Sequence, residues 1–569
     1  MMARVPLVLV AADPDRPGGA VLRAVADVAA AEAGEVGPPV RVAGVDLPAA
    51  VAEREVDRPR WVWDDTARWY PDLLAAGVRV ERAHDLRLCH TILRRSTRSA
   101  GSGVARGPAG PWDRAPEGVE GGPHEPDVPS LFDDLPGAAT APADVPDVPA
   151  ELRRQLRALT EAGDDGRLRL LLAAESTGAL IAAEMRHDGM PFRPDLHDAL
   201  LTGLMGPRPR GSERPERLAD LAAQVAAALD RPTLNPDSQP ELLRALRAAG
   251  LDVASTRTAE IRALDHPVRE PLLAYKKLAR LLSANGWAWL DRWVHEGRFR
   301  PDYVPGGVVT GRWASSGGGA LQLPAVIRDA VRADPGWRLV VADAAQLEPR
   351  VLAAMSGDGA MAAAGQQADL YAGVVAAGIV ADRQQAKYAM LGAIYGATTG
   401  ASAVLMPQLA RAYPRAVALV EEAARAGERG EQVTTWLGRS SPLPSAAWLA
   451  ERQAPSAEGA APEDAREARR RSRDWGRFTR NFVVQGTAAE WALCWMAVLR
   501  RRLLAIPGRP HLVFFLHDEV MVHAPSSVAD EVAVAVRESA VEAGRLLFGA
   551  TPVEFALDVS VVDSYADAV

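Results

Sequence analysis

The sequence predicts a mixed α/β fold divided into several domains, and two observations carry this prediction. The chain has 569 residues, and because a domain typically takes about 150, about three or four domains are expected. Short apolar runs, as in residues 5–12, 337–342 and 511–522, alternate with stretches of helical periodicity such as 167–186 and 271–295. Short apolar runs bounded by polar residues are typical of buried strands. We therefore expect sheets covered by long helices.

The composition excludes several classes of protein. Hydrophobic residues make up 48% of the chain, and no apolar run reaches the ~18–20 residues that a membrane span needs. There are only two cysteines, Cys89 and Cys494, which excludes a disulfide framework and a zinc site built on paired cysteines. We expect a cytoplasmic protein without a membrane partner.

The negative charge of the chain is concentrated in one segment. The formal net charge is −8, of which residues 101–150 contribute −7 through nine acidic residues and two arginines. Between Val268 and Arg332, ten Lys or Arg stand against five Asp or Glu, a local net charge of +5 that includes Lys276 and Lys277. Such a basic stretch can follow a phosphate backbone, so the overall charge does not exclude a nucleic-acid partner.

The N-terminal part of the chain predicts a small domain followed by a linker. Residues 1–100 alternate short strands, at 5–12 and 78–80, with Ala-rich helical stretches, which favours a small α/β domain. Residues 101–150 contain ten prolines and eight glycines, a composition typical of a flexible linker. The apolar island Leu131-Phe132 in this segment either docks on a partner or packs on its own domain.

Two acidic sites follow apolar strands at distant points of the chain. Asp343 ends one strand, and a helix is expected to begin near Pro349, since proline is tolerated in a first turn. Residues 511–524 are expected to form a β-hairpin with Asp518 and Glu519 at its turn. Each acidic residue alone could simply cap or hydrate a turn. Carboxylates from neighbouring strands can instead share two divalent ions, which in-line nucleotidyl transfer requires.

A helix beginning after Asp382 places two cations on one face. Asp382 and Gln385 have the spacing of a capping box. Arg383, Lys387 and Leu391 follow at intervals of four residues and therefore share a face. Such a face suits a triphosphate, although an ordinary solvated basic face has the same pattern. Lys387 is one of three lysines against 62 arginines, which favours a site that needs a compact ammonium group.

Two further segments carry weaker signals of nucleic-acid binding. The glycine-rich residues 308–324 allow close approach of another chain, and Arg312 within them could reach a phosphate. Asn481 and Gln485 lie one turn apart on an expected helix, where they could bind nucleic-acid edges or satisfy neighbouring backbone.

The order of these segments carries a resemblance. TGRWASS, DAAQLEPR, RQQAKYAMLGAIYG, RNFVVQGTAAE and HDE together closely resemble the bacterial family A DNA polymerases, the polymerase I type, over roughly residues 170–569. The resemblance implies a right-hand fold of palm, fingers and thumb, preceded by a small ribonuclease H-like α/β domain of the exonuclease type. The expected domains are residues 1–100 (degenerate 3′–5′ exonuclease-like), 101–150 (linker), 151–300 (connecting helices and thumb), 301–360 with 476–569 (palm) and 361–475 (fingers).

The resemblance also implies a function. It implies a template-directed DNA polymerase in replication or repair synthesis, which adds deoxynucleotides to a primer 3′-hydroxyl with two Mg²⁺ ions, for which Mn²⁺ can substitute. The implied partners are primer–template DNA and deoxynucleotide triphosphates, and we expect a monomer at the nucleoid. A non-catalytic DNA-binding scaffold with the same fold is the alternative.

The resemblance assigns roles residue by residue. The expected catalytic residues are Asp343, Asp518, Glu519 and Lys387, with Asp343 and Asp518 as the metal ligands. The expected nucleotide-binding residues are Arg383, Lys387, Glu348, Gln346, Leu391 and Tyr395, with Glu348 crowding the sugar 2′ position against ribonucleotides. The expected DNA-binding residues are Arg312, Arg477, Asn481, Gln485, His517, Lys276 and Lys277.

The chain departs from the family pattern near these residues. Ala344, Ala345 and Pro349 stand where the family usually has Tyr, Ser and Leu. Leu391 replaces an aromatic residue, and Tyr371 stands where a His is common. Because the groups that carry metal and triphosphate charge remain, we expect an active enzyme that is slower or less selective.

The front domain lacks the acids that proofreading needs. The first acidic pair of an exonuclease matches only Asp13-Pro14-Asp15 loosely, the next falls on Trp69, and Asp85 lies in the second half of the domain. We expect that the 3′–5′ exonuclease activity is lost and that no 5′-nuclease region is present. An active proofreading polymerase is the alternative. Leu131-Phe132 resembles the peptides that bind sliding clamps, which predicts a possible clamp partner.

Overall fold

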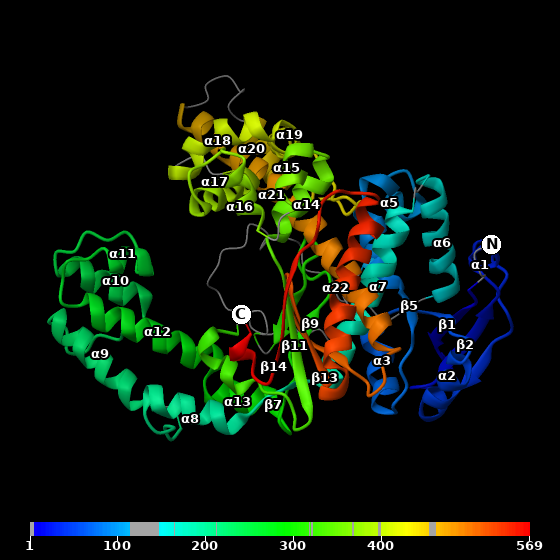
Figure 1. The fold of residues 1–569 in the computed structure, drawn as a ribbon. Coiled ribbons are helices and arrows are strands. Elements are labelled where there is room, and N and C mark those ends of the chain that lie inside the picture. Colours follow the sequence, from blue (N-terminus) through cyan, green and yellow to red (C-terminus); the bar gives the residue numbers. More distant parts are fainter. Residues whose placement is uncertain are drawn as a thin grey trace. The chain divides into compact units, whose positions relative to one another are not determined.

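The computed structural model describes residues 5–113, 147–163, 166–211, 213–317, 319, 323–366, 369–396, 400–453 and 462–568. The chain forms two compact units, coloured along the sequence in Figure 1. The first unit comprises Met1–Asp188, Asp302–Gly317 and Val340–Val561, and the second comprises Gly189–Pro301, Gly318–Leu339 and Val562–Val569.

The front of the first unit is a five-stranded sheet. Its strands are β1 (Leu7–Ala12), β2 (Ala20–Val25), β3 (Val40–Val42), β4 (Arg60–Trp63) and β5 (Arg82–Asp85). Their order is β3-β2-β1-β4-β5, with β4 parallel to β1 and β5 parallel to β4. The helices of this part are α1 (Val28–Ala33), α2 (Leu47–Glu55), α3 (Thr66–Ala75) and α4 (Leu86–Arg95).

The strand expected at residues 78–80 begins instead at Arg82. The Val78 amide donates to the Leu73 carbonyl (2.8 Å) at the end of α3, and the Val80 amide lies 3.4 Å from the Tyr70 hydroxyl. Both amides are therefore used by the turn after α3, and pairing with β4 starts later.

Both described ends of the expected linker are ordered and pack on the front sheet. Residues 101–113 contain α5 (Gly103–Arg106) and a buried Trp112, and α6 (Val148–Glu161) begins at the other end. His90 contacts both ends, with Nε2 3.2 Å from Asp113 Oδ1 and Nδ1 2.7 Å from Glu151 Oε1. Composition does not reveal this anchoring, because it rests on single side chains. Leu131 and Phe132 lie outside the described residues.

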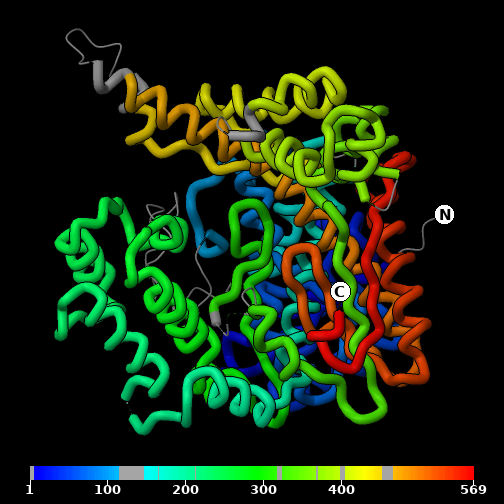
Figure 2. Tube along the Cα trace, turned by 60° about the vertical axis from the view of Figure 1, so that its left-hand side comes forward, coloured from blue at the N-terminus to red at the C-terminus, as the bar shows by residue number. Residues whose placement is uncertain are grey.

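A second sheet forms the centre of the first unit. Its strands are β11 (Trp337–Ala344), β12 (His511–Leu516), β13 (Glu519–Pro525) and β14 (Leu557–Val562), in the order β12-β13-β11-β14. Figures 1 and 2 both show these strands side by side. The hairpin expected at residues 511–524 is thus present. A further pair, β9 (Asp302–Val304) and β10 (Ala314–Gly317), is antiparallel.

Three long helices belong to this unit. They are α7 (Arg167–Asp188), α21 (Pro462–Leu503) and α22 (Ala529–Phe548), and α21 packs against the other two and against α19. Contrary to the expectation from the sequence, Arg466–Leu503 contains an apolar window long enough for a membrane span. Because 89% of that window is buried in the protein, α21 has the environment of a core helix.

A cluster of helices follows β11. It comprises α14 (Leu347–Ser356), α15 (Gly359–Ala364), α16 (Leu370–Ala376), α17 (Arg383–Tyr395), α18 (Gly400–Ala412), α19 (Pro414–Glu428) and α20 (Ala446–Gln453). The α17 helix starts as predicted, since Asp382 Oδ1 accepts from the Gln385 amide at 2.8 Å. It ends at Gly396, whose φ of 67° is left-handed and suits glycine.

The second unit is mainly helical. Its helices are α8 (Pro194–Met205), α9 (Glu216–Ala228), α10 (Gln239–Ala248), α11 (Thr258–Arg262), α12 (Arg269–Asn285) and α13 (Trp287–Trp293). Its small sheet has the order β6 (Met190–Pro191), β8 (Arg298–Phe299), β7 (Val294–His295). The helix expected at 271–295 is broken at Gly286, where a Cβ atom would lie 2.2 Å from the Leu282 carbonyl oxygen.

A buried ion pair joins three distant segments of the first unit. Arg500 of α21, only 4% exposed, donates to both carboxylate oxygens of Glu184 on α7, at 2.8 and 2.7 Å. Its remaining N–H groups donate to the carbonyls of Val80 (2.6 Å) and Glu81 (2.9 Å). Tyr70 adds a hydrogen bond to Glu184 at 2.5 Å. Burial opposes ionisation of Glu184, but Arg500 holds its pKa below the usual value.

We expect Arg500→Met to lower the free energy of unfolding by about 3–5 kcal/mol, because it leaves the buried Glu184 carboxylate with only the more distant guanidinium of Arg79, at 3.7 Å. Urea unfolding followed by circular dichroism measures the change. Arg425→Met, which removes an exposed pair with Glu422, should cost no more than about 1 kcal/mol. The double variant Arg500→Met/Glu184→Met should recover most of the loss, and equal losses in the single and double variants would contradict this account.

Candidate active site

The structure brings Asp343 and Asp518 together. Asp343 lies near the end of β11 and Asp518 at the turn between β12 and β13, and β13 and β11 are neighbours in the sheet. The Ala344 amide donates to the Asp518 carbonyl at 2.9 Å, which fixes the turn against the end of β11. Burial and the nearby charge of Asp343 raise the pKa of Asp518 to about 7. Two carboxylates that oppose each other's ionisation in this way are suited to share cations.

The carboxylates of Asp343 and Asp518 suit a magnesium site in which water and substrate supply the other ligands. Among the described residues no cluster of three or more His, Cys, Asp or Glu side chains forms a ready-made metal site. Mg²⁺ usually binds through one or two carboxylates together with water and substrate phosphates, so the pair is sufficient. Glu519, the third expected acid, begins β13 and pairs across the hairpin with Leu516.

A cavity of about 220 Å³ opens beside Asp518. It collects side chains from segments that lie far apart in the sequence, all within the first unit. The expected site residues that line it are Arg312, Gln346, Glu348, Leu391, Tyr395, His517 and Asp518. Pro349 and Tyr371, two of the departures from the family pattern, also line it.

Glu348 is fixed between two partners at this cavity. Arg312 Nη2 donates to Glu348 Oε1 at 2.6 Å, and the Tyr395 hydroxyl donates to Oε2. Burial and the hydrogen bond to Glu348 raise the pKa of Tyr395, and Gln485 also contacts its hydroxyl. The sequence did not predict the pair between Arg312 and Glu348, which are 36 residues apart.

Arg383 of α17 lies beside Tyr371, which lines the cavity. Arg383 Nε donates to Asp369 Oδ2 at 2.5 Å, and its guanidinium carbon lies 5.6 Å from the centre of the Tyr371 ring. Burial opposes ionisation of Asp369, but Arg383 and backbone hydrogen bonds hold its pKa below the usual value. Lys387, one turn later, is exposed. Asp369 was missed, although its place before the apolar start of α16 is a capping signal.

The remaining expected residues lie on other elements. Gln346 is engaged, since its Oε1 accepts from the Leu370 amide at 3.0 Å. On α21, Arg477 pairs with Asp474, and the Oδ1 atom of Asn481 is buried without a hydrogen-bond partner. Lys276 and Lys277 lie on α12 of the second unit.

The front sheet carries a separate group of aspartates at the carboxyl ends of β1, β4 and β5. Asp85 caps α4, accepting from the amides of Leu88 (3.0 Å) and Thr66 (2.7 Å). Burial and the charge of Asp65 raise the pKa of Asp85 to about 7. Asp64 accepts from Trp69 Nε1 at 2.6 Å. Sequence reasoning did not assign Asp64 and Asp65 to this edge, although both directly follow the apolar strand β4.

Asp13, at the end of β1, is also bonded within its own segment and to β3. Its Oδ1 accepts from the Asp15 amide at 3.0 Å and from Arg41 at 3.3 Å, and Asp15 itself pairs with Arg41 at 2.5 Å. Asp13, Asp64 and Asp85 thus each have a partner from their own domain.

The sheet with the paired carboxylates and the helical cluster that carries the two cations belong to a fold of the right-hand class. A solved structure, the POL domain of Pol1 from M. smegmatis in complex with DNA primer–template and dNTP, shares this fold. Its TM-score is 0.64 at 19% identity, and the match covers 99% of this chain and 96% of that one. The mixed α/β, right-hand fold predicted from the sequence is confirmed.

Sequence comparison identifies the family. The family model for DNA polymerase family A matches residues 211–567, and the chain belongs to this family. DNA polymerase I of Chloroflexus aurantiacus is 27% identical over 463 residues, which are 72% of this chain and 46% of the relative. Thermostable DNA polymerase I of Thermus thermophilus is 28% identical over 340 residues, 54% of this chain and 37% of the relative. The chain thus spans less than half the length of these relatives.

We expect Asp369→Asn to tighten the binding of deoxynucleotide triphosphates about two- to fivefold, because it removes the carboxylate that competes for Arg383. Asparagine still caps α16. Titration of the nucleotide against a primer–template complex measures the dissociation constant. Glu422→Gln on α19, which also removes an exposed partner of an arginine, serves as the control. Weaker or unchanged binding in Asp369→Asn would contradict this role.

Proposed function

We propose that this chain is a template-directed DNA polymerase that extends a primer 3′-hydroxyl with deoxynucleotides, in replication or repair synthesis. The observation that carries the proposal is the Asp343–Asp518 pair beside a cavity lined by Glu348, Leu391 and Tyr395. The partners are primer–template DNA and deoxynucleotide triphosphates, the two ligands with which the M. smegmatis chain forms its complex. The protein acts as a monomer in the cytoplasm, at the nucleoid.

Different residues bind the triphosphate, the sugar and the metal ions. Arg383 and Lys387 supply charge for the triphosphate, and Arg383 exchanges Asp369 for phosphate oxygens. Glu348, held by Arg312 and Tyr395, presents a fixed carboxylate at the sugar and disfavours a 2′-hydroxyl. Asp343 and Asp518 would hold two Mg²⁺ ions, for which Mn²⁺ could substitute. Bound there, the ions would supply positive charge to the attacking hydroxyl and to the leaving pyrophosphate.

Contacts with DNA come from the cavity, from α21 and, in the second unit, from α12. His517 lines the cavity, and Gln485 meets Tyr395 at its edge. Asn481 lies one turn from Arg477 on α21. Lys276 and Lys277 on α12 supply charge for the backbone of the duplex.

The exonuclease activity of the front domain is proposed to be lost. The proposal is supported by the hydrogen bonds of Asp13, Asp64 and Asp85, because each carboxylate accepts from a local N–H donor and only the Oδ2 atom of Asp13 is buried without a partner among these three described residues. A two-metal site would need these carboxylates free to face the same ions. The clamp contact through Leu131 and Phe132 remains a prediction.

We expect Asp343→Asn and Asp518→Asn each to lower primer extension by about 10³-fold or more, because each removes charge that holds the ions. Extension of a labelled primer on a template, with Mg²⁺ and the four deoxynucleotides, measures the rate. Asp530→Asn, at an exposed site on α22, should retain full activity, and EDTA should abolish it. A folded wild type that binds DNA but extends nothing in Mg²⁺ or Mn²⁺ would favour the non-catalytic scaffold.

We expect no shortening of a labelled single-stranded 3′ end by the wild type without deoxynucleotides. The Asp343→Asn variant, purified in the same way, controls for contaminating nucleases. Trimming that disappears in Asp13→Ala or Asp85→Ala would show instead an active proofreading enzyme, and denaturing gels separate these outcomes.

A further inference from the structure

The second unit contains a large cavity that the polymerase reaction does not use. Its volume is about 790 Å³, and it shares no lining residue with the cavity beside Asp518. All of its lining residues belong to the second unit, so the unit builds the cavity by itself. A volume of this size is within the range of ligand-binding pockets.

Backbone hydrogen bonds join the walls of this cavity. The Phe192 amide donates to the Gly297 carbonyl (2.9 Å), which joins the segment after β6 to the turn before β8. The Arg193 amide donates to Ala330 (2.7 Å), and the Ala333 amide donates to Asp563 (2.9 Å). Three chain segments are thus fixed to one another, and the cavity is pre-formed.

Five arginines line the cavity against three acidic residues. Two of the arginines hold the walls together, since Arg298 forms two hydrogen bonds with Asp334 and Arg338 Nη1 pairs with Asp563 at 2.5 Å. These pairs use two of the three acids, and the third, Glu296, is exposed. The lining therefore carries a net positive charge.

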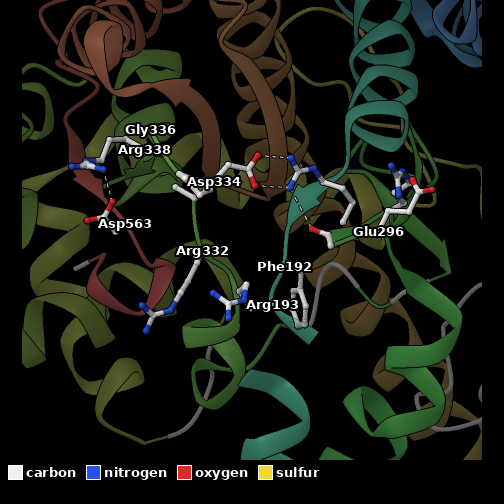
Figure 3. A pocket seen from close by; sticks show the side chains of 13 residues that line it. Phe192, Arg193, Glu296, Arg332, Asp334, Gly336, Arg338 and Asp563 are labelled. Carbon is white, nitrogen blue, oxygen red and sulfur yellow. Dashed lines mark hydrogen bonds and ion pairs between the residues drawn. The ribbon is translucent and has the colours of Figure 1, made fainter. Parts of the chain in front are cut away.

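Arg193 and Arg332, unlike Arg298 and Arg338, pair with acidic residues outside the cavity lining. Figure 3 shows both guanidinium groups below Asp334 in this view. Their partners, Asp195 and Asp329, are near in sequence, do not line the cavity, and have side chains that are 58% and 59% exposed. Exposed ion pairs of this kind are weak, so a phosphate inside the cavity can replace them.

The lining favours phosphate groups and offers no platform for a base. Phe192 is the one aromatic residue among the described lining residues. It is 2% exposed, and its ring packs against Trp289 with centroids 5.6 Å apart, so its faces are occupied. Arginine is the side chain best suited to bind phosphate through two parallel hydrogen bonds.

We propose that this cavity binds a run of phosphate groups through Arg193 and Arg332. The ligand is either the backbone of a nucleic-acid strand or a free polyphosphate, which present the same chemistry. The site does not depend on the polymerase reaction, and its test is a binding measurement.

The test compares two double variants of the full chain. Arg193→Gln/Arg332→Gln removes the two cavity arginines. Arg208→Gln/Arg269→Gln removes two arginines of the same unit that are 49% and 41% exposed and pair with Asp291 and Glu270, so both variants lose the same charge. Both are made in an Arg383→Gln/Lys387→Gln background, which removes the two exposed cations of α17 proposed to bind triphosphate. Thermal melting confirms that each is folded.

Isothermal titration with sodium tripolyphosphate is the first arm. We expect saturable binding in the background protein, a loss of about tenfold or more for each cavity guanidinium removed, and little change in the control pair. Absence of saturable binding, or equal losses in both double variants, would overturn the proposal.

The second arm identifies the source of the phosphates. Anisotropy of a fluorescent twelve-residue oligothymidylate is measured over a range of salt concentrations. If the ligand is a nucleic-acid strand, loss of two phosphate contacts should reduce the slope of log affinity against log salt by about 1.4 in the cavity variant. An unchanged slope together with lost tripolyphosphate binding supports a free polyphosphate as the ligand.

Discussion

The pairing of Arg500 with Glu184 is the constraint on which the first unit depends. One guanidinium reaches the carboxylate of α7 and two carbonyls of the front domain, and it does so from near the end of a helix of 42 residues. The same helix carries Arg477, Asn481 and Gln485 more than three turns earlier. Because a helix is stiff over this length, fixing Arg500 also fixes the position of these side chains along the helix axis, including that of Gln485, which contacts Tyr395 at the active-site cavity.

Three departures from the family pattern, at Ala344, Ala345 and Pro349, leave the backbone hydrogen bonds near the two carboxylates intact. The Ala344 amide binds the Asp518 carbonyl, and the Ala345 amide binds the Ala556 carbonyl at 3.1 Å. Both residues are buried, so small side chains suffice there. Pro349 lies in the first turn of α14, where an N–H group would have no partner within the helix. The carboxylate pair can therefore be held without the usual Tyr, Ser and Leu.

Local signals in the sequence predicted the elements that carry the site but not the contacts between them. The hairpin around Asp518 and the cap of α17 follow from neighbouring residues, and the structure contains both. The pairs Arg383–Asp369 and Arg312–Glu348 join residues 14 and 36 positions apart, and no periodicity specifies such contacts. The roles of these residues, and the division into palm, fingers and thumb at the expected boundaries, remain predictions.

The contacts of His90 with Asp113 and Glu151 tie two segments of the front domain to one side chain. His90 lies on α4, and its ring contacts Asp113 through Nε2 and Glu151, on α6, through Nδ1. The neighbours of the two acids, Trp112 and Leu152, pack in one apolar cluster. A single substitution at this histidine would therefore loosen both segments at once, whereas a substitution at either acid would loosen only one.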